Sequence, residues 1–249
     1  MNRNQLKILA AAAMLLDHIA LAFLPQTGAA YFMLRFFGRI TGPVMAYFVA
    51  EGYRYTSNVK RYALRLFAFS LVAWPAFCFF ETGCLPVQLL AGHGVPDGWL
   101  GCNPAVSDLT LAIYPHFSVL HTLLLGLLAV WLWDKGRCAR WCRALGVIAL
   151  CVLALPGDWS FYNVLFVLLF FIKRDSPNET SLAFSLLAAM MILTNTASWY
   201  DLYRLGMFLV PPLIQFCYNG LPGRRTAIGR WGFYTFYPAH LFLLRFLRF

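Results

Sequence analysis

The sequence predicts an all-α, polytopic integral membrane protein: a bundle of about nine transmembrane helices with a cytoplasmic N-terminus. Of its 249 residues, 61% are hydrophobic and 12% are charged, whereas soluble domains are usually about 45–50% apolar and about 25% charged. The apolar residues form long runs, and a membrane-spanning helix needs about 20 of them. The formal net charge is +10, but the cations cluster between these runs. They therefore indicate topology, and no nucleic-acid partner is expected.

Nine apolar runs, bounded by polar and helix-breaking residues, predict the spans. They cover residues 6–24, 32–51, 61–80, 117–134, 143–156, 159–173, 182–195, 201–218 and 231–247. The shorter runs are expected to borrow flanking residues or to enter the membrane only partly. The first run begins like a signal peptide, but Asp17 and His18 interrupt it and many runs follow, so an uncleaved span is favoured. No internal repeat is present, and residues 1–249 are expected to form one domain.

The positions of Lys and Arg predict the orientation, because cations of short loops stay in the cytoplasm. Alternate loops return to the same side of the membrane, and one set of loops carries 15 of the 20 cations. These are Arg3, Lys7, Arg54, Lys60, Arg61, Arg65, Lys135, Arg137, Arg140, Arg143, Lys173, Arg174, Arg224, Arg225 and Arg230. This set includes the N-terminus, which is therefore placed in the cytoplasm. Arg245 and Arg248 lie on the other side and are the one misfit.

The longest loop, at about residues 81–116, contains no Lys or Arg and is rich in Gly and Pro. We expect it to form an irregular extracytoplasmic cap. It holds Cys84 and Cys102, whose pairing an oxidising exterior would allow but two cysteines alone do not establish. Cys138 and Cys142 fall in a cytoplasmic loop and are expected to be free thiols.

The first span carries the most informative polar residues, because a charge inside a span costs about 2.5–3.5 kcal/mol and usually marks function. Lys7 and His18 are 11 residues apart, so they share one helix face at a separation of roughly 16 Å. A cation at the cytoplasmic mouth and an imidazole near mid-bilayer suit a long ligand with an anionic head, such as acyl-coenzyme A. His18 is the natural general base. The alternative is a structural polar cluster that joins helices.

Asp17 points about 100° away from His18 around the helix, so we expect it to pair with Arg35 or Arg39 of the second span. Those two arginines are four residues apart and share a face. They could instead hold a phosphate or a developing oxyanion. For Arg35, an outward, snorkelling side chain is the favoured interpretation, whereas Arg39 lies deeper. The pair Gly42-Pro43 just beyond predicts a kink.

Glu51 ends the second span near the cytoplasm, close to the basic stretch that includes Lys60 and Arg61. These three residues are candidates for cofactor binding. A salt bridge between Glu51 and Arg54, three residues further on, is the structural alternative.

The last span carries a second candidate polar site, His240 with Tyr237. Pro238 interrupts the helical hydrogen bonds there, so His240 could act in catalysis or gating, or could donate to a freed carbonyl. Both interpretations stay open. The histidine and acidic residues match no metal-ligand spacing, and no metal is expected.

Four stretches resemble, in chain order, the successive blocks of the TraX family. They are "LKILAAAAMLLDHIA", "LRFFGRITGPVMAYFVAEGYRYTSNVKRYALRLFAF", "FSVLHTLLLGLLAVWL" and "FYTFYPAHLFLL". The namesake of that family N-acetylates the N-terminal residue of F-type conjugative pilin. The family is also similar to the membrane acyltransferase-3 superfamily, in which a basic residue, ten residues and a histidine mark the first span. Lys7 and His18 match this spacing, with Lys in the usual place of Arg and hence without a bidentate fork for phosphate.

The resemblance implies a multi-pass protein of the bacterial inner membrane that uses acetyl-coenzyme A as cosubstrate and His18, beside Asp17, in catalysis. The acceptor would be an amine or a hydroxyl, such as a pilin N-terminus or a cell-surface glycan, and membrane lipids would surround the protein. Two other functions are open: a noncatalytic assembly factor of a pilus or conjugation system, and a small transporter. Inverted repeats would favour the transporter.

Overall fold

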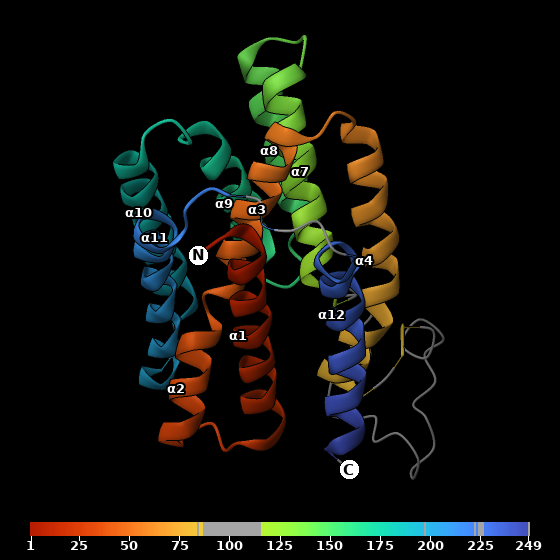
Figure 1. Cartoon of the computed structure of the whole chain (residues 1–249), viewed down its shortest axis with the longest axis vertical. Coiled ribbons are helices and arrows are strands. Elements are labelled where there is room, and N and C mark those ends of the chain that lie inside the picture. The colour runs from red at the N-terminus through yellow and green to blue at the C-terminus, as the bar shows by residue number, and fades with distance from the viewer. Residues whose placement is uncertain (84, 87–115, 197, 222, 224–226, 249) are drawn as a thin grey trace.

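The computed structural model describes residues 1–83, 85–86, 116–196, 198–221, 223 and 227–248, and the regular elements of these residues are helices (Figure 1). Cys84, Cys102 and most of the 81–116 loop lie outside the described residues, so their predicted pairing stays a prediction. The α-helices are α1 (Arg3–Phe23), α2 (Ala29–Gly38), α3 (Thr41–Tyr55), α4 (Val59–Thr82), α7 (Val119–Lys135), α8 (Arg140–Leu153), α9 (Ser160–Ile172), α10 (Pro177–Asn195), α11 (Val210–Pro212) and α12 (Ala227–Leu247). The 3₁₀ helix η1 (Trp199–Leu209) and the π-helix η2 (Leu213–Cys217) flank α11.

Local sequence explains where α1 begins and ends. The Asn2 side chain accepts a hydrogen bond from the backbone N–H of Gln5, and the Gln5 side chain accepts one from that of Asn2. This reciprocal capping box satisfies two N–H groups that the first turn leaves free. The helix ends at Phe23 because the next residue, Leu24, precedes Pro25 and takes an extended conformation.

The all-helical prediction is confirmed for the described residues, and each of the nine predicted runs contains helical residues. Two helices among the described residues, α1 and α4, are long and apolar enough to cross a membrane. The chain descends along α1, returns along α2 and α3, and descends again along α4 (Figure 1).

Two predicted spans are interrupted rather than continuous. The run 32–51 is divided into α2 and α3 by a break after Gly38. The proline at position 43 has no N–H to offer the carbonyl of Arg39, four residues earlier, and this lost hydrogen bond favours a break at this point. The run 201–218 forms η1, α11 and η2 in turn, because Pro211 and Pro212 remove two more donors.

Packing of the helices leaves a largely apolar interior with a few buried polar side chains, and an apolar exterior. Helix α1 packs against α2, α3 and α12, and α9 packs against α3 and α7. Leu6, Ala10, Val44 and Phe166 are fully buried between these helices. Large apolar side chains also cover the outside of α1 and α4, among them Ile8, Leu16, Leu64, Phe67 and Leu71. Exposed apolar surface on this scale is typical of a face that contacts lipid.

Candidate functional site

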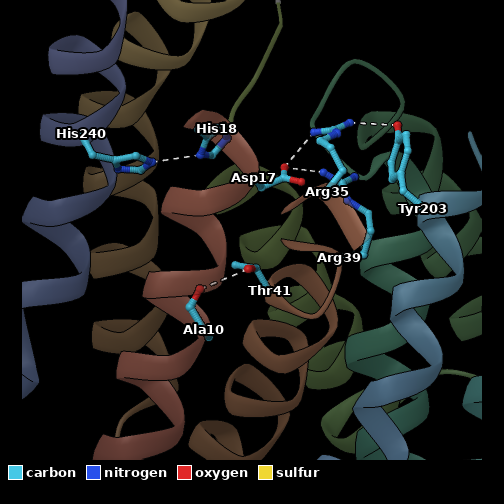
Figure 2. A network of polar contacts seen from close by, with 8 residues as sticks. All are labelled: Ala10, Asp17, His18, Arg35, Arg39, Thr41, Tyr203 and His240. Atoms are coloured by element: carbon cyan, nitrogen blue, oxygen red, sulfur yellow. Dashed lines mark hydrogen bonds and ion pairs between the residues drawn. The ribbon is translucent and has the colours of Figure 1, made fainter. Parts of the chain in front are cut away.

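Two consecutive residues of α1 form the centre of the site, and they point to different neighbours (Figure 2). His18 faces α12 and contacts His240, whereas Asp17 faces the arginines of α2 and of the break before α3. Both side chains are buried, with 6% of Asp17 and 7% of His18 exposed. As expected from the 100° turn between adjacent residues, the carboxylate does not hydrogen-bond the imidazole. His240 does so instead.

The hydrogen bonds of the two imidazoles define their tautomers. His240 Nδ1 lies 2.8 Å from the carbonyl oxygen of Phe236, which can only accept, so Nδ1 carries the proton. In the neutral ring, His240 Nε2 is then an acceptor, and it lies 3.0 Å from His18 Nδ1. His18 Nδ1 must therefore be the donor. This leaves a lone pair on His18 Nε2, which makes no hydrogen bond to the described residues.

The contacts of His240 support part of one interpretation, and a role in catalysis or gating stays a prediction. The ring donates to a backbone carbonyl, and it also orients a second imidazole across a helix boundary. His18 is further fixed by the edge of the Phe80 ring, at 5.2 Å between centroids.

Asp17 is the shared acceptor of two arginines. Arg35 Nη1 donates to Asp17 Oδ2 at 2.8 Å, and Arg39 Nη2 donates to the same oxygen. Arg35 Nη2 also donates to the Tyr203 hydroxyl at 2.9 Å, and its guanidinium lies 4.5 Å from the centre of that ring. The favoured prediction of an outward Arg35 is wrong, because only 7% of this residue is exposed. A buried carboxylate compensates the cation more fully than snorkelling would.

Two glycines of the second predicted span allow this close approach. A Cβ at Gly38 would lie 2.5 Å from Asp17 Oδ1, and one at Gly42 would lie 2.5 Å from the indole of Trp159. Any larger residue at either position would push the arginine-bearing segment away from α1 or α9. The Thr41 hydroxyl fastens the same segment to α1 by donating to the Ala10 carbonyl at 3.1 Å.

A cavity of about 170 Å³, here called the central cavity, lies against these groups. Its polar lining comprises Asp17, His18, Arg35, Arg39, Thr41, Glu81, Asp158 and Tyr237. The predicted residue Tyr237 is thus brought to the site, and its hydroxyl is buried without a hydrogen bond of normal geometry to the described residues.

Sequence reasoning missed three residues of the central cavity: Glu81, Asp158 and Trp159. Asp158 and Trp159 lie in the turn between α8 and α9, where Trp159 has the unusual φ of 63°. Burial raises the pKa of Asp158 to about 6, and perturbed carboxyl groups of this kind are common at functional sites. An Asp-Trp-Ser sequence in a short turn between apolar runs was the available signal. Nothing local indicated that this turn meets α1.

A second cavity, of about 190 Å³ and here called the Lys7 cavity, lies toward the beginning of α1. It is lined by Arg3, Lys7, Phe48, Glu51, Gly52, Thr56, Tyr62, Arg65 and Tyr234. The predicted cofactor residues Lys7 and Glu51 are therefore neighbours. Lys60 and Arg61 are exposed at the start of α4 and line neither cavity.

Glu51 is held by partners distant in sequence. Arg3 Nε donates to Glu51 Oε2 at 3.0 Å, and the Tyr218 hydroxyl donates to Oε1 at 2.9 Å. The alternative pairing with Arg54 does not form among the described ion pairs. Helix periodicity allowed that pairing, but it could not show that α1 and the segment after η2 approach the end of α3.

The Lys7 cavity and the central cavity are adjacent but share no lining residue. On α12, Phe233 lines the central cavity and Tyr234 lines the Lys7 cavity. On α3, Met45 lines the central cavity and Phe48 lines the Lys7 cavity. On α1, however, Lys7 and Met14 are seven residues apart, so about two helical turns of side chains separate the two spaces along that helix.

The fold and the site define a class: a helical membrane protein with a buried ion-pair cluster and an imidazole pair beside an internal cavity. The chain belongs to the TraX family, since the family profile described as "TraX protein" matches residues 2–92 and 103–248. The chain is also similar to the probable fimbrial assembly protein FimC, serogroup H1, of Dichelobacter nodosus. The two are 32% identical over 96% of this chain and 93% of that protein. No solved structure matches the chain significantly.

Proposed function

We propose that the protein is a membrane acetyltransferase that moves an acetyl group from acetyl-coenzyme A to an amine or hydroxyl acceptor. One observation carries the proposal: the lone pair of His18 Nε2 faces no protein partner among the described residues, while His240 fixes the opposite nitrogen at 3.0 Å. A histidine held in one tautomer, beside a cavity, has the arrangement that a general base needs.

The reaction follows from this arrangement. The acceptor nitrogen or oxygen attacks the thioester carbonyl carbon while His18 Nε2 takes its proton. The C–S bond then breaks, and the sulfur leaves as the thiol of coenzyme A after it receives that proton from His18. Arg39 borders the central cavity and is the candidate to stabilise the oxyanion, and Asp17 positions its guanidinium.

We infer that the donor approaches from the end of the bundle that carries Arg3, Lys7 and Arg65. The positive-inside rule makes this end cytoplasmic, which agrees with a multi-pass protein of the bacterial inner membrane and with nine spans. The acyl end reaches His18 by displacing the layer between the cavities. Met14 and Met45 border the central cavity on the side nearer Lys7, and flexible methionine side chains repack readily.

The acceptor is inferred from the relatives alone. The name of the Dichelobacter nodosus protein refers to fimbrial assembly, so a pilin subunit is the first acceptor to test. A cell-surface glycan is the second.

The test uses full-length protein purified in detergent, with acetyl-coenzyme A and a synthetic pilin N-terminal peptide. Release of free thiol and the mass of the acetylated peptide are measured. We expect His18→Ala to lower the rate by about 10²–10⁴-fold, the usual contribution of a general base. His121→Ala is the matched control, because His121 does not line the central cavity. Equal rates for the two variants would refute the role of His18.

A noncatalytic assembly factor is the second candidate, favoured by the name of that relative. In that case the His18→Ala variant would support normal pilus formation in cells, and the purified protein would release no thiol above background.

A further inference from the structure

The largest of the described cavities lies away from His18 and has no part in the chemistry above. It measures about 410 Å³ and is here called the aromatic cavity. It is bounded by α3, α9, the first turns of α10, and the segment from α11 to Gly220. This volume falls within the range of about 300–1,000 Å³ that is typical of small-molecule sites. One wall is the π-helix η2, and such segments occur frequently at functional sites.

Aromatic rings form most of the apolar lining. The rings of Tyr47 and Phe170 meet edge to face at 5.4 Å, and those of Phe170 and Phe184 stack at 5.5 Å between centroids. Tyr47 also meets the ring of Tyr218 at 5.9 Å. Phe170 and Phe184 are buried and support the wall, whereas the rings of Tyr47, Tyr55 and Tyr218 are at least partly exposed and suit a flat, conjugated ligand.

Cations lie where the aromatic cavity meets the surface. Arg54 and Arg174 line it and are exposed, and Arg174 is held over the Phe171 ring at 4.5 Å. The first turn of α10 lines the same cavity through Pro177 and Thr180, which adds the partial positive charge of a helix N-terminus. Arg174 also lies 3.7 Å from Asp175, but 77% of that carboxylate side chain is exposed to solvent. The surface charge therefore suits a phosphate.

Glu51 lines both the aromatic cavity and the Lys7 cavity and is the residue that they share. The negative charge of Glu51 is already compensated by Arg3 and the Tyr218 hydroxyl. Arg54 follows Gly42 of the central cavity by 12 residues of the same helix, which is about 18 Å along the axis. A ligand that reaches from the aromatic cavity to His18 must therefore join a flat phosphorylated head to a long, thin arm.

We propose that the aromatic cavity binds the adenosine phosphate portion of acetyl-coenzyme A. The adenine ring packs against the partly exposed rings of Tyr47 and Tyr218, and Arg54 and Arg174 bind the 3′-phosphate. The 5′-diphosphate passes Glu51 into the Lys7 cavity, where Arg3, Lys7 and Arg65 face it, and the pantetheine arm continues from there toward His18. This inference rests on the proposed function, but it places the nucleotide in a cavity of its own.

The test compares two double variants that remove the same charge. Arg54→Gln with Arg174→Gln alters the aromatic cavity. Arg137→Gln with Arg140→Gln alters exposed arginines of the α7–α8 loop and α8 that do not line it. Binding of adenosine 3′,5′-bisphosphate to the full-length protein is measured by calorimetry. We expect the first pair to weaken binding roughly tenfold or more per arginine, the usual effect of losing a charge-assisted hydrogen bond, and the control pair to have little effect.

A second measurement separates this inference from the proposed function. S-acetylpantetheine lacks the nucleotide, so the first double variant should raise the KM for acetyl-coenzyme A and leave that for S-acetylpantetheine unchanged. Two results would overturn the nucleotide site while leaving the proposed acetyltransferase activity standing. One is turnover of acetyl-coenzyme A without binding of the bisphosphate, and the other is an equal change in KM for both donors. Binding that depends on the two arginines and persists in His18→Ala, without turnover by any variant, would support the site and reject the enzyme. Detection by native mass spectrometry of a tightly held anionic lipid that the first double variant loses would overturn the inference.

Discussion

The ion-pair cluster at Asp17 offers the most direct test of the structure. In Asp17→Asn the side chain keeps its size and loses its charge, so the guanidinium groups of Arg35 and Arg39 lose their shared acceptor. Only 6% of Asp17 and 7% of Arg35 are exposed, so the substitution leaves buried cations without a charged partner. Breaking a buried pair by removing one partner typically costs about 3–5 kcal/mol.

For a chain of 150–250 residues, each kcal/mol of lost stability lowers the melting temperature by about 2–4 °C. Asp17→Asn should therefore lower it by roughly 6–20 °C. The measurement is thermal unfolding of purified protein in one detergent, followed by the fluorescence of its tryptophans.

Glu179→Gln is the matched control. Lys173 and Glu179 form an ion pair at 2.7 Å, but 44% and 60% of their side chains are exposed. Exposed pairs contribute about 0–1 kcal/mol, so the control should shift the melting temperature by less than about 4 °C. If both variants melt within 1–2 °C, roughly, of each other, the cluster does not hold α1 to α2 as the structure indicates.

Three further substitutions test the surroundings of the site. His240→Phe removes the hydrogen-bond partner of His18, the proposed general base, and the rate of thiol release should fall about 10- to 100-fold with folding intact. An unchanged rate would contradict the proposed tautomer. Gly38→Ala places a methyl group 2.5 Å from a buried carboxylate and should destabilise the protein by about 1–3 kcal/mol in thermal unfolding. Gly146→Ala, where the added methyl group meets mainly the end of the flexible Leu132 side chain, should lower the stability less. A larger loss of stability for Gly146→Ala than for Gly38→Ala would count against the packing described. Tyr203→Phe leaves the buried Arg35 one acceptor short and should cost about 1–3 kcal/mol in the same assay, whereas no shift would mean that water replaces the hydroxyl.

Much of the fold could be predicted from the sequence, because apolar runs and their breakers act locally. The kink near Gly42-Pro43 was expected, and the break falls where the proline withdraws a donor from the Arg39 carbonyl. The pairing of Asp17 with an arginine also followed from local geometry, since 100° between neighbours directs it away from His18.

The rest depends on which helices meet, and no local pattern contains that information. Tyr203 and Asp158 are far from Asp17 in sequence, and both reach its surroundings only through the packing of η1 and α9. The partner of Glu51 could not be predicted for the same reason, because Arg3 approaches from another helix. The positive φ of Trp159 is likewise set by the turn that the tertiary structure requires.

Because Asp17 and His18 are adjacent, the position of α1 sets two contacts together: the ion pairs of Asp17 with the arginines and the hydrogen bond between His18 and His240. Any rotation of this helix that loosens the carboxylate from the arginines also swings the imidazole relative to α12. Changing one contact without the other is therefore difficult. A ligand that displaces either side chain by moving α1 would also displace the other, because the two residues share one turn of the helix.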